Sequence, residues 1–204
     1  MLDMPTLWQP VLEFWFGESL EQGWPERSRN GLWFRADAGV DQEIRERFGA
    51  MVDAAVEKEW VDWEAKPLSR LALILLLDQF PRNIYRGSAE AFSGDHRAVT
   101  LAMEGIARGM DRKLPWIGRV FFYMPLMHAE DLDLQDECLA AFRQLRDDMP
   151  DNLREQVEGN IAFAQEHRDI IDRFGRFPHR NVALGRQSSA EELAFLEHGS
   201  SFGQ

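Results

Sequence analysis

The sequence predicts an all-α protein, and three observations lead to this fold class. Apolar residues recur at steps of three and four along most of the chain, which is the spacing of helices with one buried face. No stretch alternates apolar and polar residues for long enough to indicate a strand. Glycine and proline fall where helices begin and end. We therefore expect a single all-helical domain over residues 1–204, with about seven or eight helices.

The first half of the chain shows three helical segments. Pro10 is placed for the first turn of a short helix and Gly17 for its end, and we expect 32–34 to enter the core. The segment 41–60 is amphipathic. A third helix opens at Pro67 and is apolar on nearly every side, so it belongs at the centre of the domain. It is expected to end near Pro81, since the residue before a proline avoids the helical region.

The second half predicts further helices with recognisable ends. Asp95 is a good N-cap for a helix that stops at Gly109, and 116–145 reads as a helical region kinked at Pro125. Two capping boxes and a terminal glycine then delimit the remaining helices: Asn152 with Glu155, Gly175, and Ser189 with Glu192. Short loops between these helices favour stacked antiparallel pairs, although no fixed repeat period is present.

Composition and charge exclude several classes of protein. The 45% apolar content and seven tryptophans indicate a folded chain, and the net charge of −12 disfavours nucleic acid as a partner. The longest apolar run, Leu71–Leu77, is far shorter than the roughly 20 residues of a membrane span. Met1–Pro5 lacks the features of a signal peptide, and Cys138 has no second cysteine to pair with. We therefore expect a cytoplasmic protein; its oligomeric state stays open.

The first polar constellation closes the apolar helix. Asp78 continues the buried face of that helix, and a buried carboxylate needs a partner, for which Arg82 lies four residues on. Two interpretations stay open. Asp78 and Arg82 form a structural ion pair, or Asp78, Gln79, Arg82 and Asn83 point into a cleft.

The second constellation follows Gly175, in a segment where five arginines meet only two acids between 167 and 186. Pro178 stiffens the chain there, so the side chains beyond it hold defined positions. Arginine forks match carboxylate or phosphate oxygens, and a histidine beside them can move a proton. This group either binds an anionic ligand or locks the C-terminal segment onto acidic helices: Arg176, His179, Arg180 and Asn181.

The remaining candidates are weaker. His128 and Glu130 lack the two-histidine spacing of a zinc protease, so no metal site is predicted. His167 lies on an apolar helix face and is expected to be a satisfied core residue, and His96 is expected at the surface. No nucleotide-binding loop or nucleophile elbow is present, so the sequence indicates no cofactor.

Two functional hypotheses follow, with a purely structural polar core as the third possibility. The favoured one is a non-catalytic binding module for an anionic small molecule or a peptide carboxylate. It places ten residues at one cleft: Asp78, Gln79, Arg82, Asn83, His128, Glu130, Arg176, His179, Arg180 and Asn181. The alternative is a small hydrolase that uses His128 with Glu130, or His179 with Asp78, as its acid–base pair. Two constellations on opposite faces would exclude a single site, and a cleft closed by direct Asp–Arg pairs would favour the structural interpretation.

Several segments resemble a known family in order along the chain. They are Trp15–Gly17, Trp33–Phe34, Leu76–Gly87, Tyr123–Glu130, Arg173–Asn181 and Leu184–Arg186. Together they resemble the bacterial domain-of-unknown-function family 924. The resemblance implies a tetratricopeptide-like stack of antiparallel helices, although the repeat consensus of tetratricopeptide proteins is missing here. It implies no activity and no catalytic residue.

Overall fold

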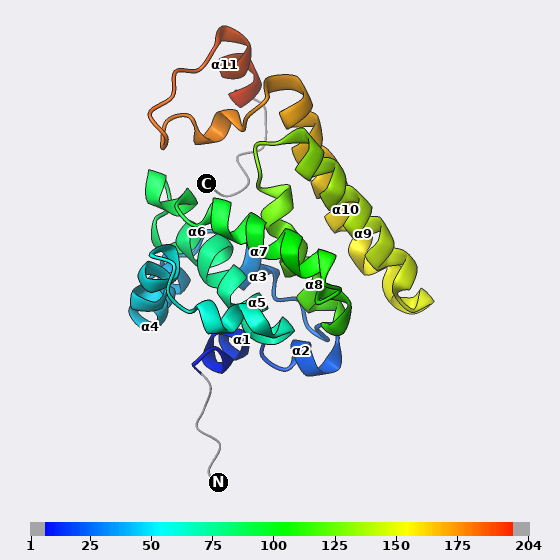
Figure 1. Cartoon of the computed structure of the whole chain (residues 1–204). Helices are drawn as coiled ribbons and strands as arrows, with labels where there is room; N and C mark the ends of the chain where they lie inside the picture. Colours follow the sequence, from blue (N-terminus) through cyan, green and yellow to red (C-terminus); the bar gives the residue numbers. More distant parts are fainter. Residues whose placement is uncertain (1–6, 198–204) are drawn as a thin grey trace.

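The computed structural model describes residues 7–197, so Met1–Pro5 lies outside the described part. Within that part all regular structure is helical, which confirms the all-α prediction (Figure 1). The α-helices are α1 (Gln9–Phe16), α2 (Ser19–Gln22), α3 (Asn30–Phe34), α4 (Ala38–Val56), α5 (Pro67–Ile74), α6 (Phe80–Ile84), α7 (Asp95–Ala107), α8 (Trp116–Met127), α9 (Leu132–Asp148), α10 (Asp151–Phe174) and α11 (Ala190–Leu196). Short 3₁₀ turns are η1 (Val61–Ala65), η3 (Ala89–Phe92), η4 (Asp111–Lys113) and η5 (Pro178–Arg180), and a π-helical turn is η2 (Leu75–Gln79).

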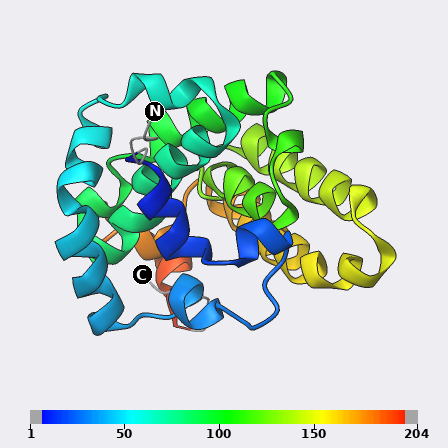
Figure 2. The ribbon, with the colours of Figure 1, turned by 90° about the horizontal axis from the view of Figure 1, so that it is seen from below.

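The helices surround a central apolar segment. Helix α4 and the long pair α9–α10 lie on opposite sides of the molecule, with α5, α6 and α8 between them (Figure 1 and Figure 2). Each residue of Leu71–Leu77 is 0% exposed, so the helix that is apolar on all sides does lie at the centre, as predicted. None of the described helices has the length and apolar character needed to span a membrane.

Aromatic rings pack the first helix against this central segment. The Trp15 ring packs 5.3 Å from the Phe80 ring and 5.7 Å from the Phe121 ring. Helix α1 is bounded as predicted, with Pro10 in its first turn and Gly17 at its end. The expectation for 32–34 holds only in part. Trp33 donates its indole N–H to the Trp15 carbonyl (2.9 Å), whereas Phe34 stays half exposed.

The central helix does not end at Pro81, which corrects the sequence prediction. Residues Leu75–Gln79 widen into a π turn, in which the Phe80 N–H donates to the Leu75 carbonyl five residues back. Helix α6 starts directly afterwards, and Pro81 occupies its first turn, where the missing N–H is not needed. Gln79, Arg82 and Asn83 therefore stand on a helical backbone, and not at or beyond a helix end near Pro81 as the sequence predicted.

Two predicted helix starts are also corrected. The N-cap of α7 is Gly94, which lies so close to the Leu77 backbone that a Cβ there would collide with it. Asp95 is thereby left inside the helix, with its carboxylate available for Arg82. Helix α10 begins after Pro150 without a capping box, so the Asn152–Glu155 prediction was wrong.

Helix α8 continues through Pro125, where the sequence predicted a kink or break. The interruption comes at residues 128–131 instead, and Asp131 caps α9 by accepting from the Leu134 N–H (3.0 Å). The later ends agree with prediction. Gly175 ends α10 in the left-handed conformation, and Ser189 forms the capping box of α11.

Candidate functional site

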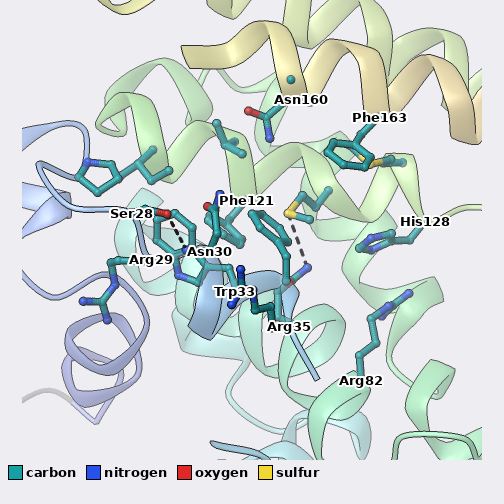
Figure 3. Close-up of a pocket in the computed structure, with 18 of the residues that line it drawn as sticks. Ser28, Arg29, Asn30, Trp33, Arg35, Arg82, Phe121, His128, Asn160 and Phe163 are labelled. Carbon is teal, nitrogen blue, oxygen red and sulfur yellow. Dashed lines mark hydrogen bonds between the residues drawn. The ribbon is translucent and has the colours of Figure 1, made fainter. Parts of the chain in front are cut away.

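A pocket of about 810 Å³ opens between the central helices and α10. One face of α8 lines it at helical spacing, from Ile117 and Phe121 to Met124. Figure 3 shows Asn160 and Phe163 of α10 on one side, Trp33 and Arg35 on the opposite side, and His128 and Arg82 at one end. The pocket therefore combines residues that are far apart in the sequence, with a polar end and an apolar wall.

The two constellations predicted from sequence do meet at this pocket. Six of the ten candidate residues line it: Gln79, Arg82, Asn83, His128, His179 and Arg180. The other four do not belong to its lining: Asp78, Glu130, Arg176 and Asn181. The pocket thus brings together Arg82, Arg180, His128 and His179, whereas the carboxylates of Asp78 and Glu130 lie outside its lining.

Asp78 lies beneath the polar end and is completely buried. Its carboxylate accepts from His128 Nδ1 (2.8 Å) and from Gln79 Nε2 (2.5 Å), and it pairs with Arg82 at 3.3 Å. Burial alone would raise the pKa of Asp78, but the attraction of His128 and Arg82 holds this pKa below its usual range. Asp78 therefore stays ionised at neutral pH and orients the side chains above it.

His128 connects this buried carboxylate to the pocket. Burial lowers the pKa of His128 more than the charge of Asp78 raises it, so the imidazole is neutral at neutral pH. An ionised carboxylate can only accept, so we infer that Nδ1 carries the proton that binds Asp78. The Nε2 lone pair is then available on a residue that lines the pocket.

Asp95 joins the two constellations. Arg82 binds it with both guanidinium arms (2.9 and 3.0 Å), and Arg180 approaches the second carboxylate oxygen at 3.5 Å. Burial lowers the pKa of Arg82, but Asp95 and Asp78 raise it further, so the net shift is upward. Both guanidinium groups also lie over the Phe92 ring, at 5.7 and 4.7 Å. The segments around Arg82 and Arg180 are thus fixed to each other through one shared acid.

Arg180 differs from its neighbours in being incompletely bonded. Its side chain lies between the Phe92 and Phe177 rings and the residue is 6% exposed. Within the described part of the chain, its buried Nε has no hydrogen-bond partner. Burial, followed by repulsion from Arg82, lowers the pKa of Arg180 to about 10. A buried cation with an open donor is costly to the fold, so this group invites a negatively charged partner.

Two further histidines border the same end. Burial lowers the pKa of His167 to about 3, and burial together with Arg180 lowers that of His179 to about 4. His167 donates Nδ1–H to the Phe163 carbonyl (2.7 Å), so it is the satisfied buried histidine that the sequence predicted. At neutral pH these imidazoles add hydrogen-bonding capacity without adding charge.

Glu130 does not bond to His128 but binds the C-terminal segment of the chain. It accepts from the Phe177 N–H (2.8 Å) and binds both arms of Arg186 (2.6 and 2.9 Å). Burial raises the pKa of Glu130, but Arg186 outweighs it and the pKa is lowered overall. The expected His128–Glu130 pair is therefore not formed, and Asp78 is the partner of His128. The expected His179–Asp78 pair is not among the bonds of Asp78.

Arg176 and Asn181 are also engaged in structural bonds. Arg176 holds Glu192 of α11 at 2.7 and 2.9 Å, and Asn181 accepts from Arg186 Nε (2.9 Å). Together these groups fasten the end of the chain onto the body. We call them the C-terminal cluster: Glu130, Arg176, Asn181, Arg186 and Glu192.

The sequence did not reveal one whole wall of the pocket. Arg29, Trp33 and Phe34 come from a segment that looked like a loop followed by core residues, and Arg29 is held there by the Trp15 carbonyl (3.1 Å). Phe163 was missed because it lies off the apolar stripe of α10. A large apolar residue outside such a stripe was the one available signal. In residues 7–197 no three His, Cys, Asp or Glu side chains are grouped so as to hold a metal ion.

The fold and this site define an all-helical protein with an arginine- and histidine-bordered pocket. The chain belongs to the DUF924 family, described as a bacterial protein of unknown function, whose model matches residues 11–200. It is also similar to the solved structure of ATU0120 from Agrobacterium tumefaciens, a protein of unknown function, with 38% identity and a TM-score of 0.77. That likeness covers 95% of this chain and 98% of the other. A comparison with curated proteins gave no match.

Proposed function

We propose that this chain is a binding protein whose pocket takes a small molecule with a negatively charged group, held by Arg180. The observation that carries this proposal is the buried guanidinium of Arg180, a residue that lines the pocket and whose Nε has no hydrogen-bond partner among residues 7–197. A ligand carboxylate or phosphate would supply the missing acceptor and offset the cost of burying the charge. The pocket volume of about 810 Å³ is within the range of small-molecule sites.

The neighbouring groups support an anion at this place. Arg82 is already bound by both arms to Asp95, so it supplies positive potential more than open donors. His128 is neutral at neutral pH and adds no charge; since its Nδ1–H binds Asp78, its Nε2 can only accept, which suits a donor group elsewhere on the ligand. Direct Asp–Arg pairs, which would favour a structural role, account for Arg82. Among the described residues, the ion pair of Arg180 is a longer contact of 3.5 Å with Asp95, beside its packing on the Phe92 and Phe177 rings.

The experiment is a titration with sodium acetate and with inorganic phosphate, followed by the ¹⁵N–¹H signal of Arg180 Nε. We expect a saturable shift in the wild type. Arg180→Gln lacks this signal, so its binding is followed by calorimetry, and we expect the binding of both anions to be lost with the helical circular dichroism unchanged. Arg173→Gln is the matched control, because Arg173 is an exposed arginine paired with Glu191 outside the pocket lining. No shift of the Arg180 signal with either anion would refute the proposal.

A second function, ester hydrolysis, is favoured by one specific observation. The His128–Asp78 bond of 2.8 Å opens on the pocket, which is the arrangement of an oriented general base. In this hypothesis, His128 Nε2 takes a proton from water, and the water oxygen bonds to the ester carbonyl carbon. The bond to the alcohol then breaks, and the alcohol oxygen receives the proton from the imidazolium that Asp78 stabilises.

The hydrolysis hypothesis is tested with 4-nitrophenyl acetate. We expect saturable turnover that falls at least about 100-fold in His128→Gln, the usual range for losing a general base. His96→Gln is the control, since His96 is exposed on α7. Turnover that is equal in all three proteins, or no greater than in buffer, would exclude hydrolysis of this ester and leave anion binding untouched.

A further inference from the structure

Away from the arginines, the pocket is walled by large apolar side chains. Its lining includes Phe121 and Met124 of α8, Trp33 and Phe34 of α3, and Phe163 of α10. Figure 3 shows Trp33, Phe121 and Phe163 facing the same space as His128 and Arg82. A simple ion would contact only the polar end, so this wall needs a separate explanation.

The aromatic rings of this wall contact one another and are held in place. The Phe34 ring stacks on the Phe121 ring at 6.3 Å and 5°, and the Trp33 ring meets Phe121 at 5.0 Å. Trp33 is fixed by its hydrogen bond to the Trp15 carbonyl. Ordered aromatic surfaces of this kind bind apolar groups at little entropic cost, because the side chains are positioned beforehand.

Two of these rings are left open to solvent on opposite sides of the pocket. Phe34 is 50% exposed and Phe163 is 56% exposed, although both are large and apolar. Such residues clustered around a concave surface mark a ligand or interaction site more often than chance exposure does. An apolar body lying between them would cover both rings.

The formal charges of the side chains around the pocket indicate the charge of the ligand. Five arginines line the pocket: Arg29, Arg35, Arg82, Arg86 and Arg180. They are faced by four carboxylates, namely Glu26 in the lining and the arginine partners Asp41, Asp78 and Asp95. The three histidines of the pocket have lowered pKa values and are neutral at neutral pH. Glu130 also acts on Arg180, but it is paired with Arg186, so that pair leaves the count unchanged. The formal surplus among these groups is one positive charge, which matches a single negative charge on the ligand.

We propose that the ligand is an amphipathic monocarboxylate, with its carboxylate at Arg180 and an unbranched acyl chain along Phe121, Met124 and Phe163. This inference rests on the proposed anion binding and adds the ligand class. Both ends of the pocket then contribute to affinity. The arginine end recognises the charge, and the aromatic wall removes the chain from water.

The test is a calorimetric titration with acetate, butyrate and octanoate at constant ionic strength. We expect the dissociation constant to fall with chain length, by up to about fourfold for each added methylene group. Octylamine and octanol, with the same chain and no carboxylate, are expected to bind at least tenfold more weakly than octanoate. Octyl phosphate should bind no more tightly than octanoate at pH 8, where it is a dianion.

Two variants separate this inference from the anion proposal. Phe163→Ser should remove most of the gain from acetate to octanoate while leaving the acetate-induced shift of Arg180 intact. Leu193→Ser is the matched control, because Leu193 is an equally exposed apolar residue on α11 outside the pocket lining. It should bind octanoate like the wild type.

The outcomes are distinct. Acetate that shifts Arg180 without any gain for octanoate overturns the ligand class and keeps anion binding. Tighter binding of octyl phosphate overturns the assignment of a single negative charge. Octanol bound as tightly as octanoate overturns the ligand class, whereas no response of Arg180 to any of the three acids contradicts both proposals.

Discussion

Arg176, Arg180 and Arg186 lie within one short segment, yet they serve different purposes. Arg176 and Arg186 belong to the C-terminal cluster, where each is bound to a carboxylate at 2.6 to 2.9 Å. Arg180 is more deeply buried than either, with one carboxylate at 3.5 Å and an unbonded Nε. The cluster closes the fold, whereas Arg180 is left incomplete at the edge of a pocket. Bonding, more than residue type, distinguishes Arg180 from Arg176 and Arg186.

Local geometry explains how neighbouring residues reach different surroundings. Residues Pro178–Arg180 form a 3₁₀ turn, in which successive side chains are about 120° apart. His179 and Arg180 thereby reach the pocket, while Asn181 joins the cluster. A segment that looks like one motif in the sequence is therefore divided between two roles.

The largest effect is expected beneath the pocket, where Asp78 supports His128 and Arg82. Asp78→Ala leaves buried donors without an acceptor and should lower the free energy of unfolding by about 3–5 kcal/mol at pH 7. Because the pKa of Asp78 lies below its unfolded value, this stabilisation is present above about pH 4 and lost at lower pH. Urea unfolding at pH 7 and pH 3 measures both. A loss below about 1 kcal/mol at pH 7 would show that Asp78 is not a support.

The buried His167, which lines the pocket, should make the free energy of unfolding depend on pH. Its folded pKa of about 3 lies below the unfolded value of about 6.5, so the folded state resists protonation. Its share of stability is complete above about pH 6.5 and decreases as the pH falls, by about 3 kcal/mol at pH 4. His167→Gln should flatten the curve of unfolding free energy between pH 7 and pH 4. An unchanged slope would contradict the assignment of a buried neutral histidine.

Glu130 tests the C-terminal cluster itself. Glu130→Ala removes the acceptor of Arg186 and of the Phe177 N–H, so we expect a loss of about 2–3 kcal/mol of unfolding free energy. Acetate binding at Arg180 should persist in the folded variant. Amide hydrogen exchange should show faster opening near residues 176–192 than in α8. Equal protection in wild type and variant would mean that the cluster does not fasten this segment.

The smallest effect on stability belongs to Arg180, and it sharpens the comparison most. Arg180→Met removes a buried, poorly bonded charge and keeps the side-chain volume, so the free energy of unfolding should change by no more than about 1 kcal/mol. Anion binding should be lost in the same protein. Chemical denaturation alongside calorimetry separates the two effects. A strongly destabilised variant would place Arg180 with the structural residues.

The sequence predicted the parts of the fold that depend on local patterns. The apolar period located the central helix at Leu71–Leu77, and glycine and serine signals located the ends of α10 and α11. The π turn before Pro81 was missed because a proline, read on its own, predicts the end of a helix. The turn itself depends on the hydrogen-bond register of the whole segment. The N-cap of α7 is Gly94 and not Asp95, and the close approach of Gly94 to Leu77 is a tertiary contact that no local pattern reveals.

The same limit applies to the site. The side chains around Arg82 and Arg180 were found because each set is contiguous in the sequence. The sequence suggested Glu130 as the partner of His128, but the packing of η2, which carries Asp78, against α8 brings Asp78 to His128 instead. Trp33 and Phe163 contribute to the pocket only through the placement of α3 and α10. Tertiary contacts of this kind carry no local signature.

The most direct measurement is a crystal structure of the wild-type protein grown with octanoate. We expect the carboxylate of octanoate within hydrogen-bonding distance of Arg180 Nε, with its acyl chain between Phe121 and Phe163. Octanoate bound elsewhere, or a pocket filled only by water at a saturating concentration, would contradict it.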